Sequence, residues 1–487
     1  MPRMPVDIVG GAYTDDARPW SEQDCVGWIP VNAEVEGTRS PEILRDPPGL
    51  KPFGFPVDES YDGRGHRGAR NVEGKAFLVV GNGLYTVDKE GDFTRLGDIP
   101  INGRGRCTLT HNQITGGNQV VIATGSTSYV WNTVTETLTQ ITDDGFPGFL
   151  TVDYINSLVI GIEPQRRFFF NSDLADAMSY NALERYEAEA SPDRLRALIV
   201  SHLEVWALGE KVIEVFENTG TVNALFENKR IVIEMGCAAT HSVQKLDNAI
   251  FFLGSDGSVY QTEGYGLRRI STYPMEQAIR ALDWHKAFAF TWSDSGHKVY
   301  YLTFPDGHTW GFDCATRQWH RRVSEGLDRW RVSTMFQWRN KWYAGSFNSG
   351  MLYELDWAYK QEGCDALIRE RVTPTLHDHQ NRVTVDEVEL LFNTGGVPTS
   401  CIYVDGDDSL AVNDPDLNDH KALIAMARDG NAFGSWTEHD LGSTGEFGKR
   451  VRRQRLGTCR NLTMKVRVTS PIRADLVAAS AIVSREP

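Results

Sequence analysis

The strongest constraint on the fold of this sequence is a hairpin-like pattern that recurs seven times between about residues 62 and 372. Each copy has two short apolar strands joined by a turn. The turns lie near Asn82, Thr127, Gln165, Glu210, Asp256, Asp306 and Asn348, at spacings of 45, 38, 45, 46, 50 and 42 residues. Repeats of this period with several strands each are typical of β-propellers, whose blades bury their faces against one another. We therefore predict an all-β protein with a propeller of six to seven blades over residues 61–375.

The blade count is left open by the copy near Gln165. The segment ERYEAEASPDRLRAL follows it and interrupts the repeat, so we expect a short helical or loop insertion there. If that copy is not a complete blade, six remain.

One copy, TFPDGHTWGFDCATRQWH at residues 303–320, suggests a glycan-processing enzyme. Its D-G-x-T-W resembles the Asp box of sialidase propellers, but that box has one residue between Asp and Gly. Here Asp306 and Gly307 are adjacent, which favours a two-residue hairpin turn with positive φ at its centre. Acidic residues of the separate EAEASPD segment could supply an acid and a base for glycoside hydrolysis. These are Glu187, Glu189 and Asp193, and we expect them to lie in a solvated or interface loop.

The two flanks of the repeat differ from it in pattern. Residues 1–60 are rich in Pro and Gly and predict an extended arm that is ordered only where it lies against another surface. Residues 376–487 contain longer alternating strands, such as RVTVDEVELLFNTG and LTMKVRVTSP, and predict an antiparallel β-sandwich-like domain.

Composition excludes several classes of protein. The formal charge is −15, from 50 basic and 65 acidic residues, which disfavours a general nucleic-acid binder. Seven scattered cysteines without a C-x-x-C pair argue against a disulfide framework or zinc site, so we expect reduced thiols in a cytosolic compartment. No signal-peptide h-region and no run of 18 apolar residues is present, and we expect neither export nor membrane insertion.

The sequence contains clusters of charged residues but no recognisable catalytic motif. No nucleophile elbow, P-loop or dinucleotide fingerprint occurs, so we predict no catalytic residues, no cofactor and no resident metal. The acidic run at 405–420 has enough carboxylates for calcium but lacks an EF-hand pattern, and whether an ion occupies it stays open. His377 and His379 flank an aspartate in what we expect to be a turn or linker. A basic run predicts an interface with an acidic partner or a neighbouring subunit, and it contains Arg450, Arg452, Arg453 and Arg455.

Several islands of sequence resemble, in the same order, the tail-hub or nozzle proteins of short-tailed bacteriophages, also called packaged DNA stabilisation proteins. They are GWIPVNAE (27–34), SPEILRDPPGL (40–50), RRFFFNSDLADAMSYNALERYEAEASPDRL, WALGEKVIEVFENTG and LGTCRNLTMKVRVTSPI. None of them is a catalytic signature. Departures from the family are extensive between the islands.

This resemblance implies a structural virion protein assembled in the bacterial host cytoplasm. Its expected partners are sister subunits in a homohexameric ring, the portal adaptor, a tail needle or plug, and a tailspike or fibre. Genomic DNA would pass through the lumen without sequence-specific binding. Docking is expected at the arm, through Pro30, Val31, Asn32, Pro41 and Glu42, and at the basic strand. A carbohydrate-binding or glycan-hydrolysing propeller is the alternative function.

Overall fold

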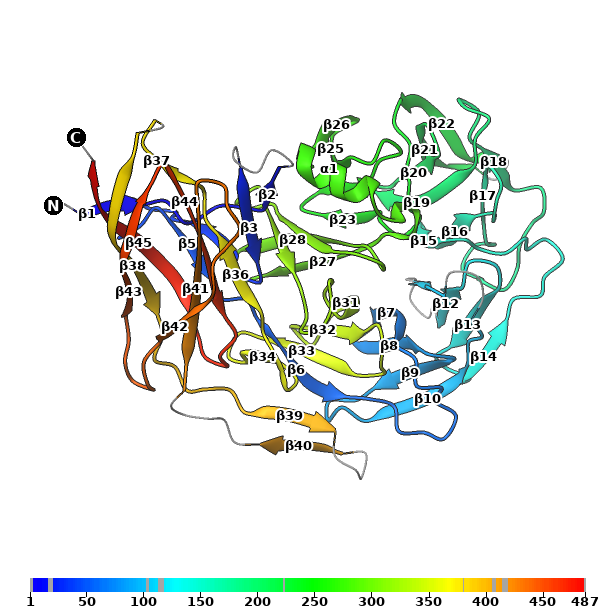
Figure 1. Ribbon diagram of the computed structural model, residues 1–487. Helices are drawn as coiled ribbons and strands as arrows, with labels where there is room; N and C mark the ends of the chain where they lie inside the picture. Colours follow the sequence, from blue (N-terminus) through cyan, green and yellow to red (C-terminus); the bar gives the residue numbers. More distant parts are fainter. Residues whose placement is uncertain are drawn as a thin grey trace.

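The computed structural model describes residues 3–15, 21–101, 105–112, 118–221, 224–379, 381–404, 409–413 and 419–485. Figure 1 shows a ring of small sheets beside a two-sheet sandwich, with both chain ends at the sandwich. The described helices are α1 (Tyr273–Arg280) and the 3-10 turn η1 (Trp284–Lys286). Neither has the length and apolar character that a membrane-crossing helix needs.

The ring consists, within the described residues, of seven four-stranded antiparallel units. The first three units are β7 (His66–Val72), β8 (Lys75–Val80), β9 (Gly83–Val87) and β10 (Phe93–Asp98); β11 (Thr108–His111), β12 (Gln119–Ala123), β13 (Ser128–Asn132) and β14 (Thr137–Gln140); and β15 (Val152–Ile155), β16 (Leu158–Ile162), β17 (Phe168–Asn171) and β18 (Arg185–Glu187). The next two are β19 (Leu195–Ser201), β20 (Glu204–Gly209), β21 (Ile213–Thr221) and β22 (Ala224–Ile233); and β23 (Gln244–Leu246), β24 (Ala249–Leu253), β25 (Val259–Glu263) and β26 (Gly266–Arg269). The last two are β27 (Phe288–Asp294), β28 (His297–Thr303), β29 (Thr309–Asp313) and β30 (Gln318–Arg322); and β31 (Val332–Trp338), β32 (Lys341–Ser346), β33 (Leu352–Asp356) and β6 (Gly49–Gly54).

The predicted propeller and its turns agree with this architecture. Each of the seven predicted turns joins the second and third strands of one unit. The expected insertion after Gln165 is only partly present, because Arg185–Glu187 forms the fourth strand of the third unit and pairs with β17, and residues 188–194 alone form a loop. Tyr186 stacks on Phe169 there, with ring centroids 5.1 Å apart. The many acidic residues of this segment did not indicate a strand, although the central residue of the strand is aromatic.

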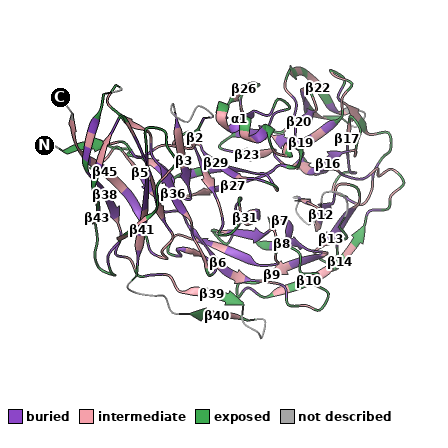
Figure 2. Ribbon diagram, in the orientation of Figure 1, coloured by how far each residue is buried: buried purple, intermediate pink, exposed green. Residues whose placement is uncertain are grey.

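The middle strands of the units are buried on both faces, as the purple strands in Figure 2 show. In β28, six of seven residues are buried, including Tyr300 and Tyr301 on opposite faces. A strand covered on both sides gains from apolar residues at consecutive positions, since each face packs against a neighbouring unit. This packing explains the high aromatic content of the repeat.

The N-terminal strand β6 closes the ring. It pairs antiparallel with β33, placing Leu50 opposite Leu355, and so supplies the outer strand of the seventh unit. Beyond β6 the same sheet continues into the short strands β34 (Gln361–Glu362) and β35 (Asp365–Ala366). A strand from the start of the chain thus holds a unit from the end of the repeat, and the edge of β33 is not left open.

The sandwich core lies between two sheets. One sheet has the order β4 (Ile29–Asn32), β5 (Glu42–Arg45), β45 (Asp475–Arg485), β38 (Val383–Asn393) and β43 (Lys449–Cys459), with β1 (Arg3–Val6) also on β45. The other contains β3 (Glu22–Val26), β36 (Arg369–Val372), β44 (Asn461–Val468), β41 (Lys421–Arg428) and β42 (Thr437–Asp440), with β2 (Tyr13–Thr14) on β3 and β37 (Leu376–His377) on β44. Trp28 is fully buried between them, and its indole N–H donates to the Ala474 carbonyl at 2.9 Å.

Residues 1–60 differ from the expected extended arm. β3 runs between β30 of the sixth unit and β36 of the sandwich, so one continuous sheet crosses both domains. The Pro- and Gly-rich segment consists of short strands separated by turns. β2 pairs with β3 and β4 with β5, whereas β1, β3 and β6 also pair with strands from distant parts of the chain. Strand β36 likewise pairs with β44, which places residues 369–372 in the sandwich and not in the propeller range 61–375.

The Asp306–Gly307 hairpin exists, but its turn is not the predicted one. Gly307 is not among the glycines with positive φ. Its N–H donates to the Phe304 carbonyl at 3.1 Å, and Phe304 N–H donates to the His308 carbonyl at 3.0 Å. The turn therefore spans four residues with Pro305 second, a place that suits the fixed φ of proline and needs no left-handed residue.

A disulfide joins Cys364 to Cys401, contrary to the expectation of reduced thiols throughout. It connects the β34–β35 turn with a two-stranded hairpin, β39 (Cys401–Val404) and β40 (Leu410–Asn413), which forms a sheet of its own at the lower edge of Figure 1 and packs Leu410 against the propeller core. The two cysteines are 37 residues apart in the sequence, so spacing alone did not reveal the pair. The other five cysteines are free.

Candidate assembly interface

The predicted docking residues of the arm come together in one hairpin. β4 and β5 pair with Pro30 opposite Leu44 and Asn32 opposite Glu42. The Ala33 N–H donates to the Pro41 carbonyl at 2.7 Å and extends the pairing toward the tip. Among the described strands β4 has β5 as its one partner in this sheet, so it forms the sheet edge. Proline suits that edge because it has no N–H to offer a further strand.

A cavity of about 610 Å³ lies between this hairpin and the sixth propeller unit. Val31, Asn32, Pro41 and Glu42 line one side, and Ser295–His297 lines the other. Pro30 lies in the same hairpin, on β4, but it is buried and does not line the cavity. A second cavity of about 190 Å³ shares Arg45 and Ser295 with the first and reaches toward the domain junction.

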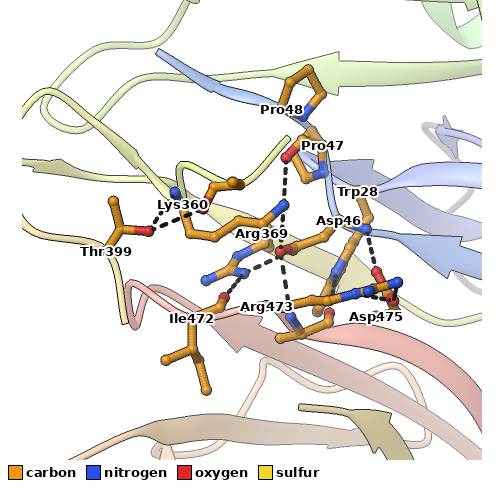
Figure 3. A network of polar contacts seen from close by, with 12 residues as sticks. Trp28, Asp46, Pro47, Pro48, Lys360, Arg369, Thr399, Ile472, Arg473 and Asp475 are labelled. Atoms are coloured by element: carbon orange, nitrogen blue, oxygen red, sulfur yellow. Dashed lines mark hydrogen bonds and ion pairs between the residues drawn. The ribbon is translucent and has the colours of Figure 1, made fainter. Parts of the chain in front are cut away.

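The wall of the second cavity contains the buried polar network of Figure 3. Asp46 lies 2.7 Å from the guanidinium of Arg369 and 3.2 Å from the ammonium of Lys360. Arg369 also donates to the carbonyls of Ile472, at 2.7 Å, and Ser470. These residues come from the N-terminal segment, the end of the propeller and the sandwich, so the network fixes the two domains to each other.

Charge pairing decides the protonation state of Asp46. Burial alone would raise its pKa, but the charges of Arg369 and Lys360 and their hydrogen bonds outweigh burial and leave the pKa below its ordinary value. The carboxylate therefore stays ionised at neutral pH. Sequence reasoning missed this network, because Asp46 and its basic partners are more than 300 positions apart in the chain and belong to no motif.

The predicted basic residues lie on β43, the opposite edge of the same sheet from β4. Arg450 and Arg452 both lie near Glu389, at 3.9 and 2.6 Å. Arg453 points to the other side and donates to the Ile424 carbonyl at 2.9 Å. Arg455 is exposed, with φ of 58°, and no ion pair to it is found within the described part of the chain.

Glutamates on β38 partly neutralise the positive charge of this basic strand. Burial would raise the pKa of Glu389, but hydrogen bonds from Arg3 and Arg452 lower it below its ordinary value. Arg3 lies 2.6 Å from the Glu389 carboxylate and 2.5 Å from that of Glu387. The side chain of Arg450 is still 51% exposed. The edge thus presents cations with only partial neutralisation.

The carboxylates considered for glycan chemistry do not gather into one site. Glu187 pairs with Arg167 in the third unit, and Asp193 accepts the Lys211 backbone N–H at 2.5 Å. Asp306 belongs to the turn of the sixth unit. Within the described ranges no group of three or more His, Cys, Asp or Glu side chains is arranged to hold a metal. Most of the acidic run 405–420, namely residues 405–408 and 414–418, lies outside the described residues.

Solved structures that are similar to this chain share little of its sequence. The computationally designed Ika8 protein has 12% identity and a TM-score of 0.37, covering 63% of this chain and 99% of that one. A streptogramin B lyase has 10% identity and a TM-score of 0.42, with 63% and 96% covered. A catalytically inactive virginiamycin B lyase from Staphylococcus aureus with quinupristin has 10% identity and a TM-score of 0.44, with 61% and 97% covered. At these values the likenesses carry no argument about this chain.

Family models, unlike the solved structures, assign this chain to a family. No curated protein matches the sequence. Residues 4–360 match the family model described as Bacteriophage P22 Gp10, beta-propeller, and residues 368–484 match the one described as Bacteriophage P22 Gp10, beta-sandwich. The first model ends just before β34 and the second begins just before β36, and the first also covers the N-terminal strands β1, β4 and β5, which the structure places in the sandwich. The two matches confirm the resemblance seen in the sequence. The chain belongs to the phage stabilisation family of bacteriophage P22 Gp10 and is a structural protein of the phage tail.

Proposed function

We propose that this protein is a non-enzymatic tail hub whose subunits close into a homohexameric ring beneath the portal adaptor. The ring extends the DNA channel, carries the tail needle or plug, and retains the packaged DNA until ejection. Tailspikes or fibres attach at the same junction, and assembly takes place in the host cytoplasm. Membership of the phage stabilisation family supports the structural tail role.

The observation that carries the ring is a pair of unlike edges on one sandwich sheet. The β4–β5 hairpin at one edge has an exposed tip that contains Glu34, Glu36 and Arg39, with Glu42 close behind, so carboxylates are in excess there. The β43 edge presents Arg450 and Arg455. A ring closed by rotation needs two different, complementary surfaces on each subunit. An acidic edge and a basic edge on the same rigid sheet meet that need.

The overall charge suits a channel for DNA. With a formal charge of −15, the chain presents an excess of carboxylates that repels the phosphate backbone and disfavours retention of DNA on the wall. The buried network at Asp46 also supports the proposal, because an interdomain joint that is fixed keeps the sandwich edges at a constant angle to the propeller.

Charge reversal tests the ring directly. Glu34→Lys with Glu36→Lys at the tip, or Arg450→Glu with Arg455→Glu on β43, should each abolish ring formation by light scattering and particle images. Combining all four changes in one chain should restore rings, because the complementarity is then reversed on both sides.

A matched control is Arg268→Glu, which alters another exposed cation that pairs with a single exposed carboxylate on the propeller. It should form rings as the unaltered protein does. Rings that persist in both charge-reversed proteins, or that fail to return in the combined one while each protein remains folded, would contradict the pairing of these edges. Stacking on purified adaptor rings, seen in the same images, tests the position below the adaptor.

A further inference from the structure

The propeller axis contains a polar cavity that the assembly proposal does not use. Its volume is about 330 Å³, and it is lined by residues of the first strands of the seven units and of the segments leading into them. Arg70, Arg106, Lys245 and Asp153 are its charged lining residues. Three cations therefore face one carboxylate in an otherwise acidic protein.

Only one of these cations is neutralised. Lys245 lies 3.7 Å from Asp153 and donates to the Val200 carbonyl at 2.8 Å. Asp153 also accepts the Val200 N–H at 2.8 Å, which occupies the same carboxylate oxygen. Arg70 donates to the Leu109 carbonyl at 2.8 Å, and Arg106 donates to Ser333, but neither has an ion pair within the described ranges. Two guanidinium groups thus remain without a counter-charge.

The electrostatics of Arg106 reflect this excess. Burial, together with the neighbouring charge of Arg329, lowers the pKa of its guanidinium to about 9. The guanidinium groups of Arg106 and Arg329 both lie over the ring of Phe288, at 3.8 and 5.3 Å from its centroid. A nearby anion would relieve both the burial and the repulsion between like charges.

Two hydroxyl groups in the cavity wall also have no partner. Thr151 and Thr334 are each 5% exposed and line the cavity, and neither Oγ1 has a hydrogen-bond partner. Buried hydroxyls are normally satisfied, so an unpaired one in a polar cavity indicates a bound polar species.

The position of these hydroxyls follows from the strand register. Thr108 Oγ1 accepts the Val152 N–H at 3.2 Å, which places Thr151 level with the start of β11. Arg106 donates to Ser333, the residue before Thr334. Arg70 donates to the Leu109 carbonyl at 2.8 Å, so its guanidinium lies beside β11. The two guanidinium groups and the two hydroxyls therefore belong to residues that surround one cavity.

We infer that the propeller axis binds a phosphate-type oxyanion, held between Arg106 and Arg70 with Thr151 and Thr334 donating hydrogen bonds. Guanidinium groups and hydroxyls are the donors that such an anion recruits. The cavity is larger than one oxyanion, and waters fill the remainder. The ligand ties the first strands of several units together at the axis.

Titration calorimetry with inorganic phosphate, against chloride at equal ionic strength, tests this site on the full-length protein. The unaltered chain should bind at one site, and Arg106→Gln or Arg70→Gln should weaken phosphate affinity at least tenfold. Thr151→Val with Thr334→Val should also weaken affinity, while the melting temperature without phosphate stays equal or rises, because the lost hydroxyls have no partner in the protein.

Thr110→Val is the matched control, since Thr110 is a fully buried threonine whose Oγ1 likewise has no partner but which does not line the cavity. It should leave phosphate affinity unchanged. Absence of binding at millimolar phosphate would overturn the inference, as would equal affinity in the folded threonine double variant. An experimental structure with phosphate located away from the axis would do the same.

Discussion

Replacing Arg369 by methionine removes the centre of the buried network while keeping a side chain of similar length. Asp46 then keeps Lys360, at 3.2 Å, and the Ala474 N–H, at 3.3 Å, as partners. The carbonyls of Ile472 and Ser470 lose their donors. Removing one member of a buried ion pair costs about 3–5 kcal/mol, because the remaining charge and acceptors stay desolvated.

Arg473→Met is the comparison that isolates burial. Arg473 pairs with Asp475 at 2.7 Å, but its side chain is 53% exposed. The loss there should be about 0–1 kcal/mol, since an exposed pair is screened by water. Asp475 also keeps the Asp46 N–H, at 2.9 Å, and the Asn393 side-chain amide, at 2.9 Å.

Hydrogen–deuterium exchange resolves the effect by segment. Protection of β36 and β45 should fall by the factor that corresponds to about 3–5 kcal/mol in the Arg369 variant, while the middle strands of the propeller keep most of theirs. Adding Asp46→Asn should cost less than the sum of the two single changes, because the residues interact directly. Equal losses in the Arg369 and Arg473 variants would refute the view that burial makes this network the joint between the domains.

Three further predictions concern acid, redox and backbone conformation. The pKa of Asp46 is lowered in the folded protein, so its contribution is complete above the ordinary carboxyl value, near 4, and is lost as the pH falls through the folded-state pKa; acid unfolding curves of Asp46→Asn should be flatter in that range. Reducing the Cys364–Cys401 bond opens a 37-residue loop, worth about 4 kcal/mol in the chain-entropy model, and should raise amide exchange in β39 and β40 as measured by mass spectrometry, with no change expected in the blades. Gly27→Ala should lower the melting temperature far more than Gly37→Ala, since both have positive φ but only at Gly27 would a Cβ meet a backbone carbonyl, at 2.0 Å; equal shifts would mean that φ alone sets the cost, about 1 kcal/mol.

The sequence by itself determined the repeating part of this protein. Alternating apolar strands and turn residues are local signals, and each unit of the propeller is built from neighbours in the chain. For that reason the seven turns, the propeller and the longer strands of the sandwich could be predicted, and the linear order of the islands pointed to the phage family.

Tertiary structure alone decided how the ends of the chain are used. Three features depend on pairings between segments hundreds of residues apart. β6 closes the ring, β3 joins the propeller to the sandwich, and β4 and β43 form opposite edges of one sheet. The Asp46 network likewise joins residues more than 300 positions apart, and the cations at the axis come together from different units. The Cys364–Cys401 bond spans only 37 residues, but it too links segments that share no local pattern. No local pattern encodes these contacts, because their free energy comes from burial and charge pairing that exist only once the distant strands have met.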